Sequence, residues 1–366
     1  MNKKTISALA LFLPLVTRVG FAYEPKDKLS LGGVLAGAIQ CQYLSDAPGV
    51  SNTCESAVPF QPKVSFRPTE ADEVFFRLGF AAGNGLNAKT PFNIAPWAAS
   101  LEEDVKNING RNRDYLLNAW YKHTFTFADD HQFGTTFGII DGTEYLDENA
   151  YANDEYTQFM NSVLTNGPNV FIPSYDLGVA LKWDHARWSL RAILMDVGEN
   201  DDGNNYRFYG LQAGYQVNNE LGAGNYRFVL VDTSKDFLDP TGTQLHDRTA
   251  ILLSFDQEFG RIVGGWIRFD WETDDAATDY STIYSGGIDI KGKAWKRHDD
   301  NIGMGYANLD GGNLDIEKSQ VAEAYYRWQL TEVLGLTADV QYMQDDYKAG
   351  GGPSGWIIGV RATAEF

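Results

Sequence analysis

Sixteen segments of alternating apolar and polar residues constrain this chain more than any other feature of its sequence. The last one, "GWIIGVRATAEF" (355–366), shows the pattern most clearly, with Trp356, Ile358 and Val360 on one face and Arg361 on the other. Such alternation is typical of β-strands with one apolar face. The segments begin near Leu29, Lys63, Glu73, Tyr115, Gln132, Tyr175, Trp188, Tyr206, Tyr226, Arg248, Arg261, Ile283, Asn301, Ser319, Val333 and Gly355. Most run for about ten residues, the length that a tilted strand needs to cross a bilayer.

The connections between these segments alternate between long and short. The short ones include "TEAD" (69–72), "ADDH" (128–131), "HAR" (185–187) and "GAGN" (222–225). The long ones include residues 42–62, 84–114, 141–174 and 235–247. Antiparallel strands joined in this way predict an up-and-down barrel with one elaborate rim.

The first residues predict export from the cytoplasm. Lys3 and Lys4 precede a short apolar run, and Gly20-Phe21-Ala22 fits a cleavage site, so residues 1–22 are expected to be a signal peptide. The barrel domain would then comprise residues 23–366. Without its first 22 residues the chain has 27 basic and 49 acidic residues, a net charge of −22. Such a chain repels nucleic acid, so we exclude that class of partner.

Export and alternating strands together favour a membrane barrel. A closed barrel pairs every backbone polar group in lipid, whereas no segment of 18 apolar residues is present to form a spanning helix. The chain ends on Phe366, as do the C-terminal strands of bacterial outer-membrane proteins. We therefore predict an all-β fold: a transmembrane antiparallel barrel of about sixteen strands, with short helices in its extracellular loops. A barrel of this size leaves an aqueous channel.

The alternation also predicts which side chains face the lumen. Phe76, Leu177 and Leu336 lie on uniformly apolar faces that suit lipid, and Trp188, Tyr215, Trp271, Trp328 and Tyr342 suit interfacial belts. The predicted pore-lining and substrate-binding residues are Arg77, Lys182, Arg191, Trp266, Arg268, Asp270, Glu323, Tyr325, Arg327, Asp339 and Arg361. Lipid exposure near midplane would cost about 2–4 kcal/mol for each Arg or Lys. Alternatively, these residues only hydrate the lumen or pair into a plug.

One long connection, "DENAYANDEYTQFMNSVLTNGPN" (147–169), carries a helix signal. Asn153 fits an N-cap, and Tyr156, Phe159, Met160, Val163 and Leu164 recur at helical spacing, which predicts about three turns ended by Asn166-Gly167-Pro168. A second helix is expected over 98–108. The apolar stripe should pack inward on the wall, although a lid on the outer surface is the alternative. The loop would then form the constriction, with Asp154, Glu155, Gln158 and Asn161 facing the pore.

The two cysteines, Cys41 and Cys54, lie within one short region of the chain. Export permits a disulfide, which would staple a loop. Metal or redox chemistry is the less favoured alternative, because no His or third Cys lies nearby in sequence and the spacing is not that of a CxxC motif.

Several segments resemble the carbohydrate-selective porins of the OprB type. They are residues 29–43, 81–121, 137–169 and 355–366, and the resemblance covers most of the mature chain. It implies a sixteen-stranded outer-membrane barrel whose extracellular loops narrow a pore suited to sugars. Aromatic faces and hydroxyl-binding Arg, Glu, Asp and Asn would suit such solutes. The expected function is passive diffusion of small carbohydrates into the periplasm, with outer-membrane lipids and the barrel-assembly machinery as partners.

Two rival functions stay open on the sequence. A nonselective porin could be lined in much the same way. An outer-membrane enzyme would need a Ser–His pair near the lipid rim, where His123 has the right parity. No catalytic residues, metal site or cofactor are predicted, because HExxH, GxSxG and P-loop patterns are absent and "DVGENDDGNNY" (196–206) does not align with a calcium loop. The sequence leaves monomer and homo-oligomer open.

Overall fold

The computed structural model describes residues 28–366, so the expected signal peptide lies outside the described residues. These residues form one closed antiparallel sheet and a small separate hairpin. The sheet strands are β1 (Leu29–Ser45), β2 (Cys54–Phe66), β3 (Asp72–Leu78), β4 (Phe80–Ala82), β5 (Leu116–Ala128), β6 (His131–Ile140), β7 (Asp176–His185), β8 (Trp188–Val197), β9 (Tyr206–Asn219), β10 (Gly222–Thr233), β13 (Thr249–Phe259), β14 (Val263–Glu272), β15 (Tyr280–Lys291), β16 (Asn301–Gly311), β17 (Ile316–Gln329), β18 (Leu334–Tyr347) and β19 (Ser354–Glu365). β11 (Phe237–Leu238) and β12 (Leu245–His246) form the hairpin.

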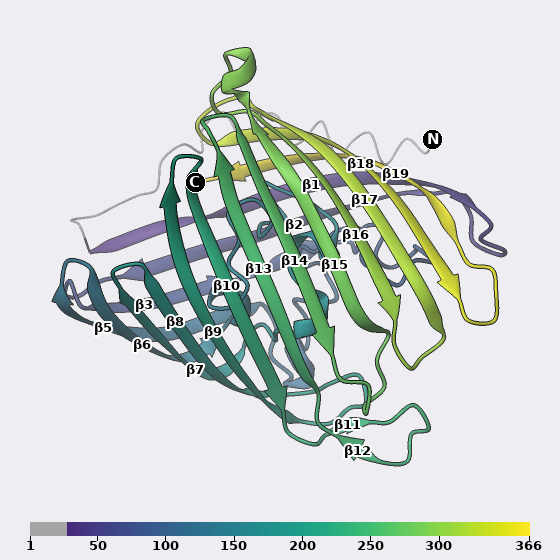
Figure 1. The fold of residues 1–366 in the computed structure, drawn as a ribbon, viewed down its shortest axis with the longest axis horizontal. Helices are drawn as coiled ribbons and strands as arrows, with labels where there is room; N and C mark the ends of the chain where they lie inside the picture. The colour runs from purple at the N-terminus through teal and green to yellow at the C-terminus, as the bar shows by residue number, and fades with distance from the viewer. Residues whose placement is uncertain (1–27) are drawn as a thin grey trace.

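The sheet closes into a barrel because β1 pairs with both β2 and β19 (Figure 1). β3 and β4 are separated only by Gly79, and both pair with β2, so they form one interrupted strand. A side chain at Gly79 would collide with Leu117, which explains a glycine at the interruption. Counting β3 and β4 together, the barrel has sixteen strands, as the alternating segments predicted.

One strand boundary differs clearly from the prediction. β2 begins at Cys54 rather than near Lys63, so the first connection spans residues 46–53 instead of 42–62. The ladder continues because Cys41 and Cys54 are cross-strand partners, and a disulfide joins them. Pro59 and Pro62 obscured this strand in the sequence, since proline usually marks an edge or a strand end.

The outer face of the barrel is apolar. Phe76, Leu177 and Val179 are exposed side chains, as the alternation predicted. Trp188 and Trp328 are also exposed, and the Trp188 ring packs against Tyr215 with centroids 4.6 Å apart. Exposed apolar area on this scale requires an apolar solvent. Among residues 28–366, no helix is both long and apolar enough to span a membrane.

The helices are short and lie in the connections. They are η1 (Ile108–Gly110), η2 (Gly142–Glu144), α2 (Ser162–Thr165), η3 (Pro168–Val170) and η4 (Gly292–Trp295). The predicted three-turn helix over 153–165 is wrong: only the single turn α2 forms, with Asn161 rather than Asn153 as its N-cap. The helix predicted over 98–108 is also wrong, because this segment forms turns that lead into η1. In both segments tertiary contacts to the wall override local helix propensity.

Candidate functional site

The segment 141–175, hereafter the inserted loop, folds into the barrel and is fixed there by charged side chains of the wall. Arg268 on β14 forms an ion pair with Asp147 of the inserted loop at 2.8 Å, and both side chains are fully buried. The Arg268 guanidinium also donates to the carbonyls of Ala152 and Thr165. Burying two charges is costly unless they are paired and hydrogen-bonded, so this anchor depends on its complete set of contacts.

Two more charged residues bind the main chain of the inserted loop. Glu323 on β17 accepts hydrogen bonds from the amides of Met160 and Asn161, at 2.6 and 2.9 Å. Arg361 on β19 donates to the carbonyls of Glu155 and Gln158, at 2.7 and 2.8 Å. These contacts satisfy backbone groups that could not reach water, because the inserted loop is not in a regular ladder.

The apolar stripe of the inserted loop packs on the same wall, as predicted. Phe159 is 1% exposed and makes edge-to-face contacts with Trp266 and Tyr325, whose ring centroids lie 5.6 and 5.2 Å away. The wall opposite Tyr151 carries Gly264, where a Cβ atom would lie 2.2 Å from the tyrosine ring. Glycine in a strand here permits close approach of the inserted loop.

The eleven residues predicted to line the pore therefore divide into two groups. Arg268, Asp270, Arg361, Trp266, Tyr325, Glu323 and Asp339 are at most 3% exposed. The inserted loop or neighbouring side chains cover them, so the prediction that they line an open passage is wrong for these seven. Lys182 and Arg191 lie near Glu148 of the inserted loop, each 3.8 Å from its carboxylate, and Arg327 pairs with Glu365. Arg77 lines a cavity beside the inserted loop.

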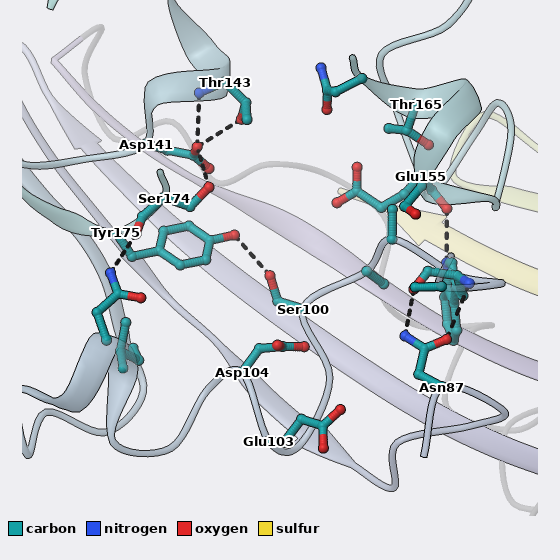
Figure 2. Close-up of a pocket in the computed structure, with 18 of the residues that line it drawn as sticks. Asn87, Ser100, Glu103, Asp104, Asp141, Thr143, Glu155, Thr165, Ser174 and Tyr175 are labelled. Carbon is teal, nitrogen blue, oxygen red and sulfur yellow. Dashed lines mark hydrogen bonds between the residues drawn. The ribbon is translucent and has the colours of Figure 1, made fainter. Parts of the chain in front are cut away.

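A cavity of about 560 Å³, hereafter the outer cavity, lies between the inserted loop and residues 83–115 (Figure 2). Its lining is rich in hydroxyl, amide and carboxylate groups. The polar lining residues are Asn87, Ser100, Glu103, Asp104, Lys106, Asn107, Asn109, Asp141, Thr143, Glu155, Ser162, Thr165, Asn166, Ser174 and Tyr175. Its volume falls within the roughly 300–1,000 Å³ of small-molecule sites.

Tyr175 crosses the outer cavity. Its phenol extends from the start of β7 to Ser100, where the two hydroxyl oxygens lie 2.8 Å apart (Figure 2). Its backbone φ of 62° is left-handed, a conformation that is strained for a bulky residue, and Arg113 binds its carbonyl. Burial raises the pKa of Tyr175, the Asp141 carboxylate adds to this, and the Arg77 guanidinium opposes it. Tyr175 therefore lies within range of the charges of both Asp141 and Arg77.

Of the four residues predicted to face the pore from the inserted loop, only Glu155 lines the outer cavity. Its carbonyl is held by Trp97 and Arg361, and its carboxyl points into the cavity (Figure 2). Asp154 caps a turn by accepting from the amides of Tyr156 and Thr157, and Gln158 bonds within the inserted loop. Asn161 is fully buried and donates to Gln341, so its prediction as a pore-facing residue is wrong.

A second cavity of about 300 Å³, hereafter the inner cavity, lies toward the end of the barrel that carries the short turns. Its lining comprises Ser30, Lys63, Ser65, Arg67, Glu73, Phe75, Arg77, Trp120 and Glu144. The rings of Phe75 and Trp120 stack with centroids 4.8 Å apart. Arg77 forms an ion pair with Glu144 of the inserted loop, next to the outer-cavity residues Asp141 and Thr143. The linings of both cavities therefore include residues from the same short stretch of the inserted loop, 141–144, hereafter the junction.

The sequence contained part of the signal for this site. Glu73 and Phe75 share the parity of Arg77, so the alternation alone could have added them to the predicted lumen. Asp104, Asp141 and Ser100 lie in irregular segments, where no periodicity predicts direction. For Tyr175 the sequence predicts only the start of a strand.

Comparisons with known proteins agree with this architecture. A model described as "Carbohydrate-selective porin, OprB family" matches residues 75–366. An uncharacterized protein of Aquifex aeolicus (strain VF5) is 28% identical over 314 residues, covering 84% of this chain and 86% of that protein.

Two solved structures of Pseudomonas putida OprB have the same fold. The high-pH structure gives a TM-score of 0.72 at 14% identity, covering 93% of this chain and 94% of that chain. The low-pH structure gives 0.58 at 12% identity and 93% of each chain. Because the family model spans most of the barrel, from β3 to β19, this chain belongs to the OprB family of carbohydrate-selective porins.

Proposed function

We propose that small sugars diffuse passively through this outer-membrane porin into the periplasm by way of the outer and inner cavities. The observation that carries the proposal is the junction of two polar cavities beside a firmly anchored loop, with Tyr175, Arg77 and Glu144 between them. A solute that crosses both cavities passes this junction.

The lining supplies both kinds of contact that a sugar needs. The ring face of the sugar can stack on Tyr175 and on the Phe75–Trp120 pair. The sugar hydroxyls can form hydrogen bonds with the carboxylates and hydroxyls around these rings. The indole N–H of Trp120 is buried with no hydrogen-bond partner in the described chain. A buried donor of this kind is costly when unsatisfied, and a passing sugar hydroxyl would satisfy it.

Ion current through single channels in planar bilayers tests the proposal. We expect glucose added at either side to reduce the current in a saturable manner, because a bound sugar blocks the junction. Mannitol at equal osmolality and viscosity is the control. A current that responds equally to both solutes, or to neither, would instead support the rival of a nonselective porin.

The enzyme alternative depends on His123, the histidine with the right parity for a site near the lipid rim. His123 on β5 lies on the outer face beside Phe125, and its Nδ1 is 2.7 Å from Asp72, which also accepts from Tyr121. We propose a structural role for this pair at the end of the barrel. Lipid-ester hydrolysis by the purified protein that disappears in His123→Ala would contradict the proposal of a channel alone.

We also infer from the alternating apolar face of β19 and the adjacent aromatic Phe366 that the barrel-assembly machinery recognises this strand. Phe366→Ser should reduce insertion, measured as the heat-modifiable folded fraction in outer membranes.

Whether the porin works as a monomer or a homo-oligomer is answered by light scattering of the detergent-solubilised protein.

A further inference from the structure

We propose that the outer and inner cavities form a charge-reversing filter, which admits neutral sugars and rejects solutes of either sign. The inference rests on the proposed function and deepens it by naming uncharged carbohydrates as the substrate class. It follows from the opposite excess of charge on the two linings.

The outer cavity is acidic. Its charged lining consists of the carboxyl groups of Glu103, Asp104, Asp141 and Glu155 and the single amine of Lys106. Lys106 is itself engaged by Glu102, 2.6 Å away. Figure 2 shows Asp141, Glu155, Asp104 and Glu103 on different sides of the same space. Even with Glu155 protonated, carboxylates outnumber amines, so this cavity attracts cations and repels anions.

The inner cavity has the opposite excess. Its charged lining comprises Lys63, Arg67 and Arg77 against two carboxylates, Glu73 and Glu144. Arg67 pairs with Glu73, and Arg77 pairs with Glu144. Lys63 is exposed and has no ion pair within the described residues 28–366, so it supplies the net positive charge. Lys122 adds a further cation by approaching Glu73 at 3.1 Å.

Two such cavities in series discriminate between solutes by their charge, whatever the size of the solute. A cation is favoured in the outer cavity but meets an unfavourable potential in the inner one, and an anion meets the same two potentials in reverse. Flux through steps in series is limited by the highest barrier, so both ions are slowed. A neutral sugar experiences neither barrier and keeps its hydrogen bonds in both cavities.

The current–voltage curve tests the filter directly. Cations entering at the acidic end and anions entering at the basic end both accumulate in the channel, whereas the reverse polarity depletes it. We therefore expect larger currents when the extracellular side is positive. Wild-type protein should also show a cation-to-anion permeability ratio near unity.

Lys63→Glu makes both cavities acidic and should remove the rectification. The permeability ratio should then shift toward cations by at least roughly fivefold, the effect of one charge at contact distance in water, because the substitution changes the charge by two units. Lys293→Glu, in the exposed turn that holds η4, changes the net charge equally but away from both cavities, and should keep the wild-type curve. A linear wild-type curve, or equal behaviour of the two variants, overturns the filter.

Charged sugars give the second measurement. In liposome-swelling assays glucosamine, a cation, and glucuronate, an anion, should both enter more slowly than glucose, and Lys63→Glu should speed glucosamine alone. Entry of either charged sugar at the rate of glucose in wild-type protein contradicts the filter. Failure of glucose itself to enter contradicts the proposed function, and leaves the rectification as a separate result.

Discussion

The barrel has two inner walls that look alike in sequence and behave differently in the structure. The covered wall, on β13 to β19, carries Arg268, Glu323 and Arg361, which are buried against the inserted loop. The open wall, on β2, β3 and β5, carries Lys63 and Arg77, which line the inner cavity. Inward parity therefore predicts the direction of a charged side chain but not whether water reaches it.

The difference follows from what each charge meets. Arg268 is buried away from water, and Asp147 and two loop carbonyls replace the hydrogen bonds that water would make. Lys63 is exposed, so water can solvate its charge. A buried charge such as Arg268 thus determines where the inserted loop sits, whereas a charge such as Lys63, which is exposed and without an ion pair in residues 28–366, acts on the solutes that pass. Substitutions that act on one wall alone can test this distinction.

The largest effect is expected on the covered wall. Arg268→Ala leaves Asp147 buried and unpaired, which should reduce the free energy of unfolding by about 3–5 kcal/mol and release part of the inserted loop. Melting followed by heat-modifiable gel mobility measures the stability, and single-channel conductance should rise. Arg327→Ala is the control, because its partner Glu365 is half exposed and such pairs contribute about 0–1 kcal/mol. Equal melting of the two variants would show that burial of an ion pair does not set its contribution to stability.

A smaller effect is expected from substitution of Tyr175, which lines the outer cavity. Tyr175→Ala removes the ring face and should weaken sugar block of the current by roughly two- to tenfold, since an aromatic contact contributes about 0.5–1.5 kcal/mol. Tyr175→Phe keeps the ring and loses the hydrogen bond to Ser100, so its sugar affinity should stay closer to that of the wild type. If both variants lose affinity equally, the hydroxyl rather than the ring face recognises the sugar.

The smallest effect concerns Glu155. Its main-chain carbonyl is bound by Arg361 of the covered wall, and its carboxyl lines the outer cavity. Burial first, and then the Asp154 carboxylate, raise the pKa of Glu155 to about 8. Its carboxyl is therefore mostly neutral at pH 6 and ionised at pH 9, so cation preference should increase over this range by less than about threefold. Reversal potentials in a salt gradient measure the change. Glu155→Gln should flatten the step near pH 8, and an unchanged step would assign it to another carboxyl.

Much of the barrel could be predicted from the sequence because one physical rule governs every strand. In lipid all backbone groups must be paired and one face must be apolar, so alternation indicates strand number, direction and outer surface. The rule weakened where prolines interrupted β2. In the inserted loop, helical spacing from Tyr156 to Leu164 predicted inward packing correctly but a helix wrongly, because the wall residues Glu323 and Arg361 bind the backbone in an irregular path.

By itself, then, the sequence determined that this chain is an exported sixteen-stranded barrel with charges directed to its lumen. Only the tertiary structure decided which of those charges hold the inserted loop and which line a passage. The reason is that burial depends on what lies opposite a side chain, and here Asp147 lies opposite Arg268 from 121 residues away. The same long-range folding brings Tyr175 to Ser100 and places an acidic cavity in series with a basic one.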